Sequence, residues 1–196
     1  MNIQYTHKEE QIFQSALSLI LDKGFHGTPM SQIAKASQVS IGTIYHYFES
    51  KDDLILQLFS YSKNKVSAFI TDSVFDDPIT KENYEEKFMI FWRRFISFYL
   101  KHPSIFSFLE QFYASPYYEM YQKKYCASNY SEDTINRFLN EGLSLNAIRK
   151  MSSHILYTFC LGSVIFLIRN SIYGQKKHTE NQINQLIQTI WNGVKI

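Results

Sequence analysis

Apolar residues recur at helical spacing along nearly the whole chain. In residues 8–23 they recur every three or four positions, which predicts a helix with one apolar face that ends at Gly24. The members of this face are Ile12, Phe13, Ala16, Leu17 and Ile20. The next segment predicts a short helix that reaches Ala36, with Thr28 as its N-cap and Pro29 at its first position.

Serine and threonine residues predict where further helices begin. Ser40 would cap a very short helix, and Ser50, with Asp53 three residues later in a capping-box pattern, would begin a long one. Seven glycines and four prolines in 196 residues are too few for the turns of an all-β protein, so we predict an all-α fold. The remaining helices are expected from Thr80 to about His102, between Pro103 and Pro116, over about 117–126, from Ser131 to about Glu141, over about 145–173, and over about 180–194 after a capping box of Thr179 and Gln182.

The very short helix after Ser40 needs support from its neighbours, because an isolated helix of this length is marginal in water. Ile44 and Phe48 fall on one side of it, at 100° per residue. The opposite side is expected to carry Thr43, His46 and Tyr47, with Tyr45 at its edge. A helix-turn-helix motif has this organisation, since its second helix is braced by packing and enters the major groove of DNA.

Residues 12–59 resemble the DNA-binding domain of the TetR family of transcriptional regulators. The resemblance is carried by the Gly24-Phe25 turn, Thr28, the "IA" of the second helix, the run "VSIGTIYHYF" and the "SKDDL" that begins the fourth helix. It implies an N-terminal three-helix DNA-binding unit over residues 1–50, followed by a larger helical ligand-binding and dimerisation body over residues 51–196. It also implies a repressor that leaves a pseudo-palindromic operator when a small, largely apolar or aromatic effector binds.

The same resemblance implies which residues contact DNA. Thr28, Tyr45, Tyr47 and Lys51 would mostly hold phosphates, whereas Thr43 and His46 could also reach base edges. Ile41 stands where many relatives carry Lys or Arg, which leaves a contact to a thymine methyl group or plain packing as alternatives. The full set expected at DNA is Thr28, Ser40, Ile41, Gly42, Thr43, Tyr45, His46, Tyr47 and Lys51.

The backbone and the charge of this domain depart from the usual pattern. Gln38 occupies a turn position where relatives usually have glycine, which predicts modest backbone strain. Residues 1–52 hold four lysines and five carboxylates, whereas a DNA-binding domain is usually basic. We therefore expect few ionic phosphate contacts and a shallow salt dependence. The low charge also leaves an alternative open, an all-α carrier or sensor of hydrophobic small molecules without DNA binding.

Aromatic residues make up 16% of the chain and concentrate after Thr80. Such a stripe is typical of a packed core, but the resemblance implies an apolar effector cavity with a few polar groups. Glu110 would favour a cationic or hydrogen-bond-donating effector if it points inward, and a solvated helix face is the alternative for Glu110 and for Lys63. The residues expected at the effector are Lys63, Phe88, Phe91, Trp92, Phe95, Tyr99, Phe106, Glu110 and Tyr113.

The stretch over residues 155–168 is apolar nearly all round. Its 14 residues are too few to span a membrane, which needs about 20, so we interpret it as a buried helix of a protein without a membrane segment. In the TetR family the last two long helices form a four-helix dimer interface, and a twofold dimer predicts a pseudo-palindromic operator. The residues expected at this interface are Ile148, Met151, Ile155, Phe159, Gly162, Phe166, Ile183, Leu186 and Ile190.

The sequence contains no pattern that indicates catalysis or a bound metal. None of the six histidines stands at metal-ligand spacing with another histidine or a cysteine, and no nucleophile with a neighbouring base or phosphate-binding glycine loop is found. We therefore expect no enzyme activity, no cofactor and no metal. Cys126 and Cys160, in a chain whose start lacks a signal-peptide pattern, predict reduced thiols and a cytoplasmic location.

Overall fold

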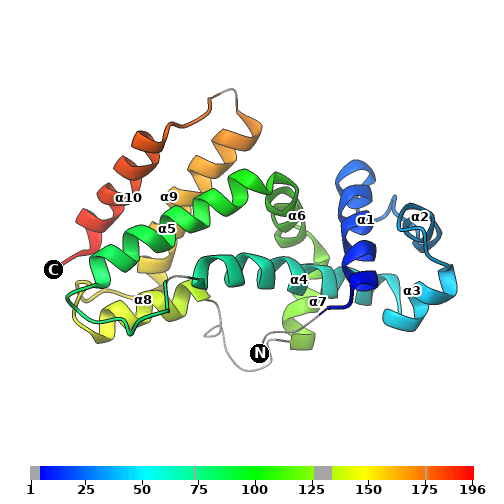
Figure 1. Ribbon diagram of the computed structural model, residues 1–196, viewed down its shortest axis with the longest axis horizontal. Helices are drawn as coiled ribbons and strands as arrows, with labels where there is room; N and C mark the ends of the chain where they lie inside the picture. Colours follow the sequence, from blue (N-terminus) through cyan, green and yellow to red (C-terminus); the bar gives the residue numbers. More distant parts are fainter. Residues whose placement is uncertain (1–4, 73, 126–133, 175) are drawn as a thin grey trace. The chain divides into compact units, whose positions relative to one another are not determined.

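The computed structural model describes residues 5–72, 74–125, 134–174 and 176–196. Within these ranges the only β pairing is a single bridge between Ile148 and Lys195, so the predicted all-α class is confirmed. The described helices are α1 (His7–Lys23), α2 (Met30–Ala36), α3 (Ile41–Tyr47), α4 (Lys51–Thr71), α5 (Tyr84–Lys101), α6 (Pro103–Tyr113), α7 (Pro116–Tyr125), α8 (Thr134–Ser144), α9 (Ser153–Tyr173) and α10 (Glu180–Val194) (Figure 1).

The chain divides into two compact units. Unit 1 comprises Met1–Lys65 and His102–Ala127, and unit 2 comprises Val66–Lys101 and Ser128–Ile196. Helices α6 and α7 therefore group by packing with α1, α2 and α3, and α4 begins in unit 1 and ends in unit 2. The expected boundary at residue 50 separates the helix-turn-helix motif by function and stays a prediction.

Unit 1 is built on the apolar face of α1. All five residues predicted for that face are buried. The ring of Phe13 packs against those of Phe48 and Tyr61, at centroid distances of 5.3 and 4.7 Å. Farther along α4, Phe59 stacks on Phe112 of α6 at 4.0 Å. These contacts fix the helix-turn-helix segment to α1 and fix α6 to the middle of α4.

The predicted N-cap of α2 is wrong. Pro29 occupies the cap position, and α2 begins at Met30 with no side-chain cap. Thr28 is buried, and its hydroxyl donates to the carbonyl of Gly24 at 2.9 Å. The threonine therefore closes the turn after α1 and does not cap α2.

The caps predicted for α3 and α4 are confirmed. The Ser40 hydroxyl accepts from the N–H of Thr43 at 3.0 Å, and that of Ser50 accepts from the N–H of Asp53 at 3.1 Å. The Asp53 carboxylate accepts a hydrogen bond from the N–H of Glu49, one residue before the cap, so the capping box is displaced by one position.

The core of unit 2 is aromatic and lies between α5, α8, α9 and α10. Phe91 of α5 stacks on Phe138 of α8 at 4.3 Å, and the buried Tyr84 hydroxyl donates to the carbonyl of Phe138 at 3.0 Å. A β-carbon on Gly142 would collide with the Tyr84 ring, so this position requires glycine. Trp191 of α10 covers Phe88 at 5.1 Å.

One helix of unit 2 begins later than predicted. The helix expected from about residue 145 begins only at Ser153. Asn146 adopts a left-handed φ of 52°, and the N–H of Arg149 donates to the carbonyl of Val194, which ties this segment to the end of α10. Helix α8 is described from Thr134, while its expected start at 131 and Cys126 lie outside the described residues.

Only one side of helix α9 is covered by the rest of its own chain. Among the described helices it alone is long and apolar enough to cross a membrane by length and composition, a test that core helices of soluble proteins also pass. Ile155, Phe159 and Phe166 are 58%, 43% and 63% exposed. The expected burial of this helix is therefore confirmed for one side, and burial of the other side by a partner subunit stays a prediction. The side chains it buries are Leu156, Cys160, Val164, Leu167 and Ile168.

Candidate nucleic-acid interface

Helix α3 is seven residues long and is held by packing. Ile44, in the middle of the helix, and Phe48, the residue that follows its last turn, are fully buried. The N-cap hydroxyl of Ser40 fixes the other end. A helix too short to persist alone is thus braced at both ends, as predicted.

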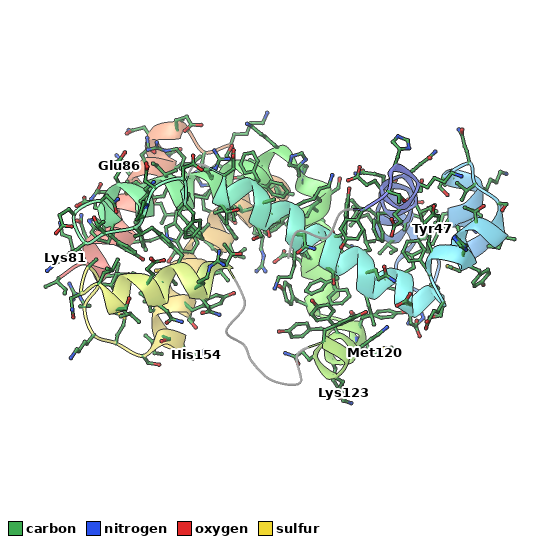
Figure 2. The ribbon with its side chains drawn as sticks, turned by 60° about the horizontal axis from the view of Figure 1, so that its bottom comes forward. Tyr47, Lys81, Glu86, Met120, Lys123 and His154 are labelled. Carbon is green, nitrogen blue, oxygen red and sulfur yellow. The ribbon has the colours of Figure 1, made fainter. Side chains whose placement is uncertain are left out.

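The outer face of α3 differs from the predicted one. It consists of Ile41 and Tyr45, which are 43% and 54% exposed, together with the exposed Gly42 and His46. Tyr47, labelled on α3 in Figure 2, is half-buried and contacts the His46 ring at 5.3 Å. Tyr45, predicted at the edge of this face, is therefore exposed, whereas Tyr47, predicted on the face itself, is half-buried.

Two threonines expected at DNA already have other hydrogen-bond partners. The hydroxyls of Thr43 and Ser40 lie 2.8 Å apart, so Thr43 belongs to the cap of α3 and is half-buried. Thr28 offers no exposed surface, and its hydroxyl is bound to Gly24. The prediction of a phosphate contact from the Thr28 side chain is wrong for this conformation.

Lys51 is the one lysine of the expected set, and it lies at the start of α4. It is half-buried, and its Nζ atom is 3.5 Å from the carbonyl oxygen of His26. His26 itself is exposed. The sequence did not indicate this pairing, because the two residues are 25 positions apart.

Helix α7 is attached to the first turn of α4. The Tyr117 hydroxyl donates to Asp52 at 2.9 Å, and Lys124 forms an ion pair with Asp53 at 3.1 Å. Burial, and then the hydrogen bond to the Asp52 carboxylate, raise the pKa of Tyr117 to about 12. Met120 lies on the exposed side of α7 (Figure 2). These contacts connect α7 to the residues that follow α3, and no local pattern in the sequence indicated them.

The residues expected at the effector are divided between the two units. In unit 2, the α5 rings are buried, and no hydrogen-bond acceptor lies near Nε1 of Trp92 in the described residues. The same holds for Nε1 of Trp191, which sequence reasoning did not include. The unit 2 members are Phe88, Phe91, Trp92, Phe95 and Tyr99.

The other four expected effector residues belong to unit 1. Lys63 is half-buried, with Nζ 5.8 Å from the centre of the Phe59 ring. Phe106 is buried, Glu110 is half-buried, and Tyr113 is exposed beside the same Phe59 ring.

The residues expected at a dimer interface also separate into groups. Ile155, Phe159, Gly162 and Phe166 form an exposed stripe along α9, which we call the α9 stripe. Met151 and Leu186 are half-buried. Three further members are buried by their own chain, so their assignment to the interface is corrected. The sequence could not show this, because an apolar helix face has the same pattern whether it packs within a subunit or between subunits. The three buried members are Ile148, Ile183 and Ile190.

Among the titratable residues that the structure describes, no three from His, Cys, Asp and Glu are close enough to hold a metal ion. A short braced helix with an exposed face, preceded by a packed helix and a tight turn, defines a helix-turn-helix DNA-binding protein. The family model described as "Bacterial regulatory proteins, tetR family" matches residues 12–58, and that described as "Tetracyclin repressor-like, C-terminal domain" matches residues 83–195. The chain belongs to the TetR family of DNA-binding transcriptional regulators, which are not enzymes.

Individual relatives agree with this assignment. An uncharacterized HTH-type transcriptional regulator of Haemophilus influenzae is 25% identical over 190 residues, which covers 97% of each chain. A crystal structure of a TetR-family regulator from the same species has a TM-score of 0.79 at 22% identity, covering 96% of this chain and 97% of the other. A fatty acid metabolism regulator protein of Bacillus subtilis is 38% identical over 80 residues, or 41% of this chain and 39% of its own. The alternative of a carrier without DNA binding does not fit this family.

Proposed function

We propose that this regulator is a homodimeric repressor in the cytoplasm, which inserts α3 into the major groove at each half of a pseudo-palindromic operator. The observation that supports the proposal is the outer face of α3, where Tyr45 and His46 protrude from a helix fixed by the buried Ile44. Regulators of this family bind DNA operators and small-molecule effectors. Recognition helices of such motifs read base edges, while flanking residues hold the backbone.

The DNA contacts divide by position on the motif. Gly42, Tyr45 and His46 face the groove, and Ser40, Tyr47 and Lys51 lie at the margins for phosphate contacts. His26 joins this set because it is exposed beside Lys51. Few lysines take part, so we expect affinity to fall only gently with salt.

Substitution of the α3 face tests DNA binding. With a labelled duplex selected from a random library by the wild-type protein, we expect Tyr45→Ala and His46→Ala each to weaken binding about tenfold, a typical effect of losing one base contact. Fluorescence anisotropy measures this affinity. His154→Ala and Tyr125→Ala, at exposed positions on α9 and α7, serve as matched controls and should bind normally. Unchanged affinity in both α3 variants would contradict the proposal.

The effector is proposed to enter the aromatic core of unit 2. A buried N–H donor without an acceptor costs about 1–3 kcal/mol, and the described part of this core has two such donors, on Trp92 and Trp191. Both indoles pack against Phe88. This arrangement favours an apolar molecule that brings an oxygen acceptor, such as a carbonyl or carboxylate group.

Release from DNA is proposed to pass along α4, because this helix begins beside α3 and ends in unit 2. A shift of α4 would change the separation of the two recognition helices. A near-complete switch requires the effector to prefer the released conformation by roughly 5 kcal/mol.

Fatty acids are the first probes for this effector, because they combine a long apolar chain with a carboxylate, and one relative carries fatty acid metabolism in its name. We expect dodecanoic or octadecanoic acid to release the operator duplex. Trp92→Phe should weaken release about tenfold, since it keeps an aromatic ring but removes the N–H donor. Tyr125→Phe, an exposed ring on α7, is the control. A fatty acid that binds the protein but leaves operator affinity unchanged would rule out this mechanism.

A further inference from the structure

The outer face of α3 begins with an aliphatic side chain. Ile41 is the first residue of the helix and is 43% exposed, although the same helix buries Ile44 completely. Tyr45 lies one turn later on the same side, because residues four positions apart in a helix are neighbours. An isolated surface isoleucine needs no explanation, but this one stands at the end of the helix that is closest to the bases in helix-turn-helix complexes.

The chemistry of this face limits which bases it can recognise. Guanine is read most often by Arg or Lys, and α3 carries neither between Ile41 and Tyr47. The C5-methyl group of thymine is the apolar feature of the major groove, and aliphatic side chains recognise it by contact. An exposed isoleucine is complementary to that methyl group and to no hydrogen-bonding edge.

The residue next to Ile41 allows a close approach. Gly42 has no side chain. Apart from its two chain neighbours and the helix backbone, the one described atom within 4 Å of a β-carbon built there is the Ser40 hydroxyl oxygen, at 3.7 Å. The surface beside Ile41 is therefore open, so a base edge can lie against the backbone of the first turn.

We propose that Ile41 selects thymine at one position in each operator half-site by contact with its methyl group. This inference rests on the proposed role of α3 as the recognition helix. Transfer of one methylene-sized group from water contributes about 0.8 kcal/mol, which corresponds to about fourfold in affinity for each half-site.

Replacing thymine by deoxyuridine removes the methyl group and keeps base pairing, which gives a direct test. In the selected operator, one thymine position at a time is replaced in both half-sites, and affinity is measured by fluorescence anisotropy. We expect one position at which deoxyuridine weakens wild-type binding about fourfold per half-site. Ile41→Ala should bind the thymine and deoxyuridine duplexes equally, whereas Ile41→Val should keep most of the preference.

The controls separate this inference from the proposed function. Met120→Ala, which also shortens an exposed apolar side chain, should keep the full preference for thymine. If His46→Ala loses binding but no deoxyuridine position matters to the wild type, the role of α3 stands and the methyl contact is overturned. The contact is also overturned if Ile41→Ala keeps the same preference. Failure of the wild type to select any duplex would overturn both the recognition role of α3 and the methyl contact.

Discussion

Cys160 illustrates how burial sets the chemistry of a single side chain in this protein. It lies on the buried side of α9, and burial raises the pKa of its thiol to about 12. The thiolate is the reactive form of cysteine, so this residue behaves as a small apolar side chain. Nearby, burial also raises the pKa of Tyr84, whose hydroxyl stays protonated and bound to Phe138.

Thiol labelling checks this state of Cys160. In a Cys126→Ser variant, we expect dithiobisnitrobenzoate to react with the native protein about a thousandfold more slowly than with the urea-unfolded chain, because both access and thiolate formation are suppressed. Absorbance at 412 nm follows the reaction. Similar rates in the two states would show that α9 opens readily and that the thiol is not protected.

Single residues also show where sequence reasoning stops. Gln38 adopts a left-handed φ of 54°. The predicted backbone strain is confirmed, because Gln38 stands at a turn position where relatives usually have glycine. Thr28 followed by Pro29 has the composition of a helix start, yet its hydroxyl is bound to Gly24. Local composition indicates which partners are available but not which of two competing backbone groups takes the hydroxyl.

At the scale of helices, the sequence predicted best where each end is encoded locally. Helix α10 begins at the predicted capping box, and α1 ends at the predicted Gly24. The start of α9 was missed because Ile148 pairs with Lys195, 47 positions away in the chain. The attachment of α7 to α4 was missed for the same reason, since no local pattern records which carboxylate a distant tyrosine will contact.

This attachment predicts a particular response to alkaline pH. The pKa of Tyr117 is raised in the folded protein, so its contribution to stability is complete below about pH 10 and is lost as the pH rises toward 12. In tyrosine ring NMR spectra at about pH 11, we expect the Tyr117 signal to remain that of the neutral phenol, whereas the phenol of a free tyrosine peptide is largely ionised at this pH.

Two variants identify the signal and the cause of its shift. Tyr117→Phe removes the resonance and so assigns it. Asp52→Asn should lower the pKa only part of the way toward 10, because burial is the larger cause and the carboxylate the smaller. Ionisation of Tyr117 near pH 10 in the wild type would contradict the contact with Asp52.

At the scale of the molecule, the α9 stripe is an apolar surface that its own chain leaves uncovered. Phe159 lies against Gly193 of α10, so the stripe borders both of the last two helices. Twofold pairing places the same patch of each subunit against the other. The sequence predicted this surface in part, but it could not separate the exposed side of α10 from the side packed on α5.

Charged residues in the stripe test the dimer. We expect the Phe159→Glu, Phe166→Glu double variant to be monomeric by size-exclusion chromatography with light scattering, because pairing would bury unpaired carboxylates. The double variant should also bind the operator more weakly, since each monomer presents one recognition helix. Met120→Glu, at an exposed apolar position of α7, should leave the dimer intact. A monomeric wild type, or a dimeric double variant, would contradict this assignment.

The pairing of Lys195 with Ile148 has a practical consequence for protein engineering. The backbone carbonyl of Lys195 also accepts from the Arg149 guanidinium at 3.1 Å, so the residues just after α10 hold the loop before α9 in place. A variant that ends at Val194 would lose both contacts, so the loop that leads into α9 and the stripe would be less firmly held. Biochemical work on subunit assembly should therefore keep Lys195 in place.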